Sequence, residues 1–515
     1  MTHLTWLADD KIGDAVSEID LIRASDLVGC RYRLRQRLAH PDVPPLPEAV
    51  ARQPQIDAGR AAVFSALPVE RALGDGRGKA FTRVDLDPTD PIAQSERRTR
   101  AAMKAGAHLI TNAVLTGAVA GVEILAEIDV LVRAETGERT YMPVMVSNHR
   151  VARASTSEKL LFVPTHRLSL GSPLATGAKL RHHTADGYRL AMAHLLLGER
   201  ADGRAALVGQ DRSRAYLTPV ERFVPPLIEA LNAPVPTEPR RLKQCASCRF
   251  WPLCEPRLEE MDDISLVLPG GRADGLRERG IETVQALIDA RVGEPSAIAN
   301  AWRQGIGVLK RTETTSVPRA DVEIDIDMEA YLDQGAYLWG TFDGETYRAF
   351  ATWDEVGGAW EEANFADFWE WLTGVRAAAH AAGKTFAAYC YASGGENHWL
   401  KSSARRFSSV DEREVREFIA SEEWVDVFAH VRHQLVGTDG LGLKVLGPVV
   451  GFAWEDDDVD GERSVALRRA ARLGDAAARE MLLRYNEDDC RATRAVREFL
   501  SAGAPGLRLL SELSP

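Results

Sequence analysis

The sequence predicts an α/β protein built from several domains. At 515 residues the chain is too long for one hydrophobic core. Strand-like runs alternate with amphipathic helical stretches in its last third, and strand and helix patterns are also mixed in its first half. Its apolar content of 45% and charged content of 27% are those of ordinary globular proteins, so disorder is not indicated.

Three regions follow one another along the chain. The first, residues 1–258, contains two strand patterns, VEILAEIDVLV and TYMPVMV, on either side of an ETGER turn, which predicts a β-hairpin. The second, residues 259–318, has the pattern of short helices around a glycine-bearing turn. The third, residues 319–515, opens with the β pattern ADVEIDIDMEA and ends in a long helix, so we expect an α/β sheet domain there.

Composition also restricts the place and partners of the protein. No apolar stretch is long enough to cross a bilayer, and residues 1–16 lack the basic-then-apolar pattern of a signal peptide, so a cytoplasmic protein with no membrane partner is expected. The net charge of −12 excludes a histone-like, non-specific nucleic-acid binder. It does not exclude a nucleic-acid enzyme, because bound cations offset the charge of metal-binding carboxylates.

The cysteines are unevenly placed. Three form a C-x2-C-x5-C pattern and one stands far upstream: Cys245, Cys248, Cys254 and Cys30. Four thiolates suit a zinc ion or an iron–sulfur cluster. A zinc ribbon normally has two close pairs, whereas one ligand here is single and remote. We predict that these four bind a metal centre and that Cys390 and Cys490 are ordinary buried thiols.

Acidic residues of the third region stand at informative spacings. Asp325 and Asp327 are two apart on a predicted strand, so their side chains point to the same face. Glu396 follows the strand pattern FAAYC at the start of a helix. Tyr485 and Asp489 are four apart on the last helix and share one of its faces. Carboxylates gathered in this way are the ligands of two-metal phosphodiester hydrolysis.

The order of these motifs resembles that of the DEDD exonucleases, whose catalytic domain is RNase H-like. The resemblance implies that Mg²⁺ or Mn²⁺ ions are bound by Asp325, Asp327, Glu396 and Asp489. It implies that Tyr485 orients the attacking water and that the enzyme is a 3′–5′ exonuclease. Asp426, in a V-D helix motif, is a further acidic candidate, and Lys444 is a candidate for contacting a phosphate.

The isolated cysteine and its late triplet resemble the RecB-family PD-(D/E)xK nucleases that carry a [4Fe–4S] cluster. For residues 1–258 this implies a restriction-endonuclease-like α/β fold and a cluster on the four cysteines, with Zn²⁺ as the alternative. Asp129 stands where the family has its strand aspartate, but Met145 and Ser147 replace the Glu and Lys of the next strand. Ala62 and Val63 replace the upstream His and Glu, so we expect this domain to be catalytically degenerate.

Residues 268–286 resemble a helix-hairpin-helix, which offers backbone N–H groups to a phosphate. Arg272, Arg277 and Arg279 would add positive charge for nucleic-acid binding. An ordinary helical linker is an equally good interpretation, because αα turns that contain glycine are common.

Nearly the whole chain is thus similar to RecB-like nucleases that fuse an iron–sulfur PD-(D/E)xK domain, a helical hairpin and an RNase H-like domain. The resemblance implies a metal-dependent nuclease acting on DNA in repair or recombination, with its chemistry in the third region. Two alternatives stay open: a non-catalytic nucleic-acid-binding scaffold with both sites eroded, and an RNA-directed exonuclease. The sequence does not indicate protein partners.

Overall fold

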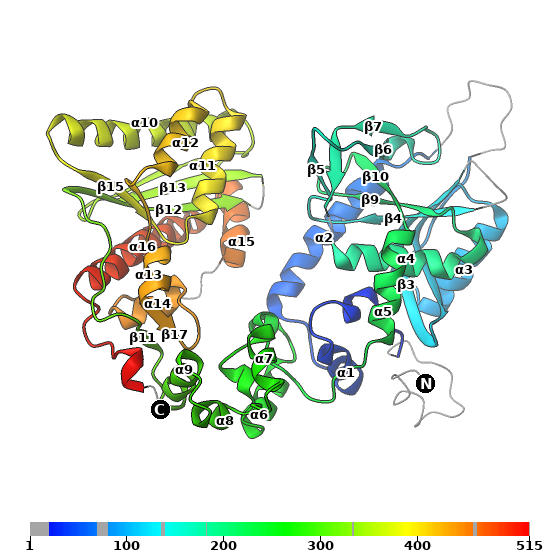
Figure 1. The fold of residues 1–515 in the computed structure, drawn as a ribbon. Coiled ribbons are helices and arrows are strands. Elements are labelled where there is room, and N and C mark those ends of the chain that lie inside the picture. Colours follow the sequence, from blue (N-terminus) through cyan, green and yellow to red (C-terminus); the bar gives the residue numbers. More distant parts are fainter. Residues whose placement is uncertain are drawn as a thin grey trace. The chain divides into compact units, whose positions relative to one another are not determined.

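The computed structural model describes residues 20–69, 81–134, 140–181, 183–331, 334–456 and 461–513. The chain forms two compact units, Met1–Glu260 and Met261–Pro515 (Figure 1). The predicted linker 259–318 therefore lies almost entirely in the same unit as the predicted third region. The N-terminal segment 1–16 and the turn 135–139 lie outside the described residues. Among the helices that are described, none is both long and apolar enough to cross a membrane.

The first unit is built on an eight-stranded sheet of order β1-β2-β3-β4-β9-β10-β6-β7. Its strands are β1 (Arg83–Asp85), β2 (Leu109–Val119), β3 (Val122–Arg133), β4 (Tyr141–Val146), β6 (Leu160–Pro164), β7 (Leu174–Thr176), β9 (Arg204–Val208) and β10 (Arg214–Pro219). A separate two-stranded sheet pairs β5 (Ala152–Ala154) with β8 (Ala178–Leu180). The helices are α1 (Tyr32–Ala39), α2 (Pro47–Ala66), α3 (Ile92–Ala105), α4 (Thr184–Leu197), α5 (Val224–Asn232) and α6 (Trp251–Glu260).

The predicted strands β3 and β4 pair antiparallel, with Val130 opposite Val144, which confirms the pairing expected for the two strand patterns. Strands β2 and β3 are joined by Ala120 and Gly121, both with positive φ, as a tight hairpin turn requires. Helix α4 packs on β2, β3 and β4 and buries its apolar run into the core of the unit.

The second unit contains a five-stranded sheet of order β14-β13-β12-β15-β16. Its strands are β12 (Val322–Tyr331), β13 (Gly335–Phe342), β14 (Tyr347–Ala351), β15 (Phe386–Cys390) and β16 (Trp424–Asp426), and a small second sheet pairs β11 (Val308–Lys310) with β17 (Leu435–Gly437). The helices are α7 (Asp274–Arg277), α8 (Val284–Asp289), α9 (Glu294–Arg303), α10 (Ala359–Ala381), α11 (Gly394–Arg406), α12 (Glu412–Ala420), α13 (Val427–Gln434), α14 (Leu443–Val449), α15 (Gly461–Arg472) and α16 (Ala476–Ser501).

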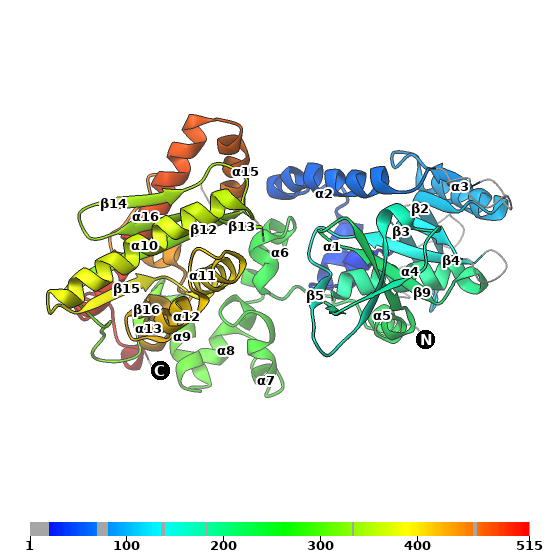
Figure 2. The same cartoon turned by 90° about the horizontal axis from the view of Figure 1, so that it is seen from above.

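Helices α10 and α16 cover opposite faces of this sheet (Figures 1 and 2). Strands β12, β13 and β14 are antiparallel, whereas β15 and β16 run parallel to β12. Ile324 and Ile326 of β12 pack with Phe365 and Phe368 of α10 in one apolar cluster. Because side chains alternate along a strand, the odd-numbered residues of β12 face α16 instead. The predicted α/β architecture is confirmed.

Candidate functional site

Acidic residues occupy four alternate positions of β12 on the face that α16 covers: Glu323, Asp325, Asp327 and Glu329. Helix α16 packs along this strand. Its side chains at 486, 489 and 497 determine what each of the strand acids contacts, so the row of acids divides into two parts with different partners.

Asp327, Glu329 and Asp489 form an acidic centre. One carboxylate oxygen of each lies within 4.8 Å of a carboxylate oxygen of the other two. Asp489 is buried, while Asp327 and Glu329 are partly exposed and can be reached from solvent. Three carboxylates at this spacing repel one another unless a cation lies between them, and oxygen ligands of this kind suit Mg²⁺ and Mn²⁺.

The pKa values of these carboxyl groups reflect the crowding. Burial, followed by the charges of Asp489 and Glu396, raises the pKa of Glu329 to about 8. Burial raises the pKa of Asp489 to about 6, against hydrogen bonds from Trp454 and Tyr485 that lower it. The pKa of Asp327 is also well above its ordinary value, because of burial and then the charge of Asp489. Without a bound cation, these carboxyl groups therefore keep protons to a higher pH than ordinary carboxyl groups do.

The metal-free protein is therefore expected to lose stability as the pH rises. Between pH 4.5, the ordinary pKa of Glu329, and its folded value of about 8, the folded state keeps a proton that the unfolded chain has lost. This contribution to the free energy of unfolding is complete below pH 4.5 and is lost as pH rises through 8. Thermal unfolding in a chelator should show the decline, and Glu329→Gln should flatten it; equal slopes in the two proteins would contradict the expectation.

Asn486 holds Asp327 in place. Its side-chain amide donates to Asp327 Oδ2 at 2.7 Å, and its Oδ1 accepts from the Tyr347 hydroxyl at 2.7 Å. Gly340 stands opposite Asp327 on β13, and a Cβ atom there would collide with Asn486 Oδ1. No sequence pattern indicates this support, although Asn486 follows directly after Tyr485.

Asp489 has its own supporting contacts. Trp454 Nε1 donates to Asp489 Oδ1 at 2.8 Å, and the Tyr485 side chain is hydrogen-bonded to the same carboxylate. The Lys444 ammonium lies 5.1 Å from the centre of the Tyr485 ring and 5.6 Å from that of Trp454. Burial raises the pKa of Tyr485, so its hydroxyl keeps its proton. The predicted pair Tyr485 and Asp489 therefore lies on one helix face with Lys444 beside it.

Glu396 and Asp426 take different positions around the acidic centre. Glu396 is buried in the first turn of α11, and burial followed by the charge of Asp426 raises its pKa to about 7. Its own charge raises the pKa of Glu329, which places it near the centre. Asp426 caps α13 and accepts hydrogen bonds from the Ser393 backbone N–H at 3.2 Å and hydroxyl at 2.9 Å. Asp426 thus fixes the loop that leads into α11.

The structure does not bring Asp325 into the acidic centre. Arg497 donates to both of its carboxylate oxygens, at 2.6 and 2.8 Å, and all exposed surface of the two side chains is lost. Arg497 also contacts Glu323 at 2.8 Å. Asp489 and Arg497 are eight residues apart on α16, a distance of about 12 Å along the helix. About four residues of a strand cover the same distance, so these two side chains contact positions of β12 that are about four residues apart. Glu329 thus occupies the place that the sequence assigned to Asp325.

In the first unit Asp129 is held by arginines. Arg60 Nε lies 2.8 Å from one carboxylate oxygen, and Arg189 lies 3.0 Å from the other, which also accepts from the Val146 backbone N–H at 2.7 Å. Met145 is fully buried in the apolar core of the unit. Position 145 thus supplies no second carboxylate, and two arginines already neutralise Asp129.

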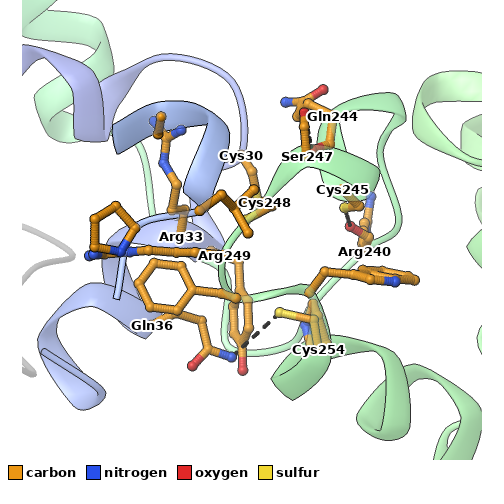
Figure 3. Close-up of a pocket in the computed structure, with 17 residues that line it drawn as sticks. Cys30, Arg33, Gln36, Arg240, Gln244, Cys245, Ser247, Cys248, Arg249 and Cys254 are labelled. Carbon is orange, nitrogen blue, oxygen red and sulfur yellow. Dashed lines mark hydrogen bonds between the residues drawn. The ribbon is translucent and has the colours of Figure 1, made fainter. Parts of the chain in front are cut away.

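The four predicted cysteine ligands line one pocket of about 420 Å³ (Figure 3). Cys30 precedes α1, Cys245 and Cys248 lie in the turns before α6, and Cys254 belongs to α6. The Gln36 side chain donates to Cys254 Sγ at 3.5 Å, and the Leu242 backbone N–H donates to Cys245 Sγ at 3.2 Å. Burial raises the pKa of Cys254 to about 11, so without a cation it is a neutral thiol.

The three hairpin arginines differ in their surroundings. Arg277 is paired with Asp263 through two contacts of 2.7 and 2.9 Å and is mostly buried. Arg272 and Arg279 are exposed. Only the latter two are therefore placed where a phosphate could reach them without breaking an ion pair.

Residues 326–501 match the model of the RNase H superfamily. This part of the chain is an RNase H-like domain. The match contains Asp327, Glu329, Glu396, Tyr485 and Asp489, and it indicates a nuclease-type function on a nucleic-acid substrate.

The other comparisons add nothing to this. A solved structure titled "Crystal structure of SSO0001" is 15% identical over 47% of this chain and 90% of that chain, but its TM-score of 0.21 is too low to support an argument. No curated protein sequence is similar to the chain. The predicted RNase H-like domain is confirmed, whereas the RecB-like first domain and its cluster stay predictions.

Proposed function

We propose that the RNase H-like domain is a two-metal 3′–5′ exonuclease that acts on DNA. The observation that carries the proposal is the convergence of Asp327, Glu329 and Asp489 within this domain. Polarity rests on the resemblance of Tyr485 and Asp489 to the last motif of tyrosine-type DEDD exonucleases, and the preference for DNA rests on the resemblance of the chain to RecB-like nucleases. A role in repair or recombination rests on the same resemblance. The acidic centre favours catalysis over the scaffold alternative, because uncompensated carboxylates are costly to keep in a site without a function.

Each residue of the site has a proposed role. Asp327, Glu329 and Asp489 hold Mg²⁺ or Mn²⁺, and Glu396 is the fourth carboxylate. The bound ions would activate the attacking water and stabilise the leaving oxygen. The protonated Tyr485 hydroxyl orients that water next to Asp489. Lys444, which lies over the Tyr485 ring, supplies positive charge for a phosphate of the substrate.

End-labelled DNA and RNA, single- and double-stranded, test this function with Mg²⁺ or Mn²⁺ present. Wild type should shorten DNA from its 3′ end, and Asp489→Asn should abolish the activity. Glu487→Gln is the matched control, because Glu487 is two residues away and pairs with Arg491 at the helix surface. Activity that survives Asp489→Asn refutes the site, loss from the 5′ end refutes the polarity, and preferential digestion of RNA supports the RNA-directed alternative. If wild type is inactive on every substrate, the non-catalytic scaffold is the alternative that the result supports.

We propose further that the first unit does not cut. Both oxygens of Asp129 are occupied by arginines, and Met145 and Ser147 offer neither a carboxylate nor an ammonium group. Together with Arg23, the two arginines line a pocket of about 390 Å³. The same pocket is lined by Asp90, Glu127 and Asp129, so its charges balance, and the proposed role of this unit in binding or scaffolding rests on the resemblance alone.

The pocket formed by Cys30, Cys245, Cys248 and Cys254 is proposed to hold a [4Fe–4S] cluster. Four thiolates are the usual ligands of this cluster. In such a cluster each cysteine would bind a different iron, and Zn²⁺ bound by the same four sulfurs is the alternative.

The anaerobically purified protein is therefore expected to be brown, with broad absorbance near about 400 nm from the thiolate-bound iron. Cys248→Ser should bleach the protein and lower its melting temperature, because the cluster would join the segment before α1 to α6. Cys390→Ser, a change of the same kind in the other unit, should keep the colour. A colourless wild type that contains stoichiometric zinc would contradict the iron–sulfur cluster. It would still support a metal ion that joins the same two segments.

A further inference from the structure

A second group of metal-ligand atoms lies in the first unit, apart from the cysteines and from Asp129. It consists of His149, His183 and Asp186, and one ligand atom of each lies within 4.8 Å of the others. His149 follows β4, His183 stands at the N-cap of α4, and Asp186 lies in the first turn of that helix. The group therefore joins the end of a central strand to the beginning of the helix that packs on it.

The three side chains lie close together. His149 Nε2 lies 3.0 Å from Asp186 Oδ2, and the rings of His149 and His183 are stacked with their centres 3.6 Å apart and their planes at 20°. The Ser147 hydroxyl lies 2.7 Å from His149 Nδ1. A hydrogen bond at one ring nitrogen orients a histidine so that its other nitrogen serves as a ligand. The Ser147 hydroxyl is nearer to Nδ1 than to Nε2, which lies 3.3 Å away, and Nε2 is the nitrogen that faces Asp186.

Asp186 Oδ2 lies close to the His149 ring but forms no hydrogen bond of good geometry with it. Its side chain is only 9% exposed, and within the part of the chain that is described its Oδ2 atom has no hydrogen bond of acceptable geometry. Such an oxygen is costly to bury unless a donor or a cation satisfies it. His149 is 33% exposed and His183 is exposed, so an ion can enter from solvent.

We propose that His149, His183 and Asp186 bind a first-row transition-metal ion, for which Zn²⁺ is the probe. Two imidazoles and one carboxylate suit such an ion better than Mg²⁺ or Ca²⁺, which prefer oxygen ligands only. Three protein ligands leave a coordination position open to water or to a substrate oxygen. Asp129 has no part in this site, because Arg60 and Arg189 occupy its carboxylate. The bound ion fixes β4 to α4, and it does so whether or not the RNase H-like domain cuts.

The test measures the number of zinc ions bound per chain of the full-length protein after equilibrium dialysis. The acidic centre and the cysteines can also take up Zn²⁺, so the differences between matched variants are compared and not the totals. His149→Ala and Asp186→Asn should each bind one zinc ion fewer per chain than wild type. His166→Ala, which removes an exposed histidine of the same unit, should bind as much zinc as wild type. Equal zinc contents in all four proteins would overturn the proposal.

A stability measurement separates loss of the ion from loss of the fold. His149 lies partly at the surface, so His149→Ala should keep the far-ultraviolet circular dichroism of wild type. Zn²⁺ should raise the melting temperature of wild type and of His166→Ala by more than that of His149→Ala, because an ion that binds only the folded state stabilises it. An equal increase in all three proteins would mean that zinc stabilises the chain from another site, and would reject this one.

Discussion

Asp327→Asn and Glu329→Gln are each expected to reduce phosphodiester hydrolysis by at least about 10³-fold, the several kcal/mol that a catalytic metal supplies. The same variants should unfold at a higher temperature than wild type when metal is absent. The reason is that each removes a charge from a group whose members raise one another's pKa. Activity and metal-free stability should therefore change in opposite directions, as measured by hydrolysis and by thermal unfolding in a chelator.

Mg²⁺ should reverse this order of stability. It should raise the melting temperature of wild type and of Glu487→Gln by mass action, and raise that of the two site variants less.

Asp325→Asn tests whether Asp325 or Glu329 is the metal ligand on β12. It should destabilise the protein, because Asp325 is paired with Arg497, but the folded fraction should keep its activity. A folded Asp325→Asn protein that is inactive, beside an active Glu329→Gln protein, would restore Asp325 as the metal ligand.

Arg497→Met is expected to cost about 3–5 kcal/mol of the free energy of unfolding, the usual effect of removing one partner from a buried ion pair. Arg497 and Asp325 are both 0% exposed, and Glu323 is paired with the same guanidinium. Without Arg497, two carboxylates on β12 lose their principal cation inside the domain. Urea unfolding of the two proteins measures the difference.

Arg413→Met is the matched control. Arg413 and Glu417 form a pair on α12 whose side chains are 83% and 64% exposed, and exposed pairs contribute little, so no measurable change is expected. The double variant Asp325→Leu with Arg497→Met should recover part of the loss, because it removes the unpaired charge as well. Equal stability of Arg497→Met and wild type would contradict the proposed role of this network in holding α16 on β12.

Local periodicity was enough to predict several parts of the site. Asp327 on a strand, Glu396 at a helix start, and Tyr485 with Asp489 on one helix face follow from repeats of two and of about 3.6 residues. These repeats depend on backbone geometry alone, so a single sequence is enough to read them. The four cysteines were found from ligand chemistry and spacing in the same way, and the structure places them around one pocket.

Which acids of β12 lie together depends on long-range packing. Periodicity places Asp325, Asp327 and Glu329 on one face, but it cannot tell where α16, some 150 residues later, crosses the strand. That crossing is set by packing, and it puts Asp489 beside Asp327 and Glu329 and gives Asp325 to Arg497. For the same reason the sequence could not predict the arginines that contact Asp129, nor the group formed by His149, His183 and Asp186. Residues that are close in space but far apart in sequence leave no local pattern.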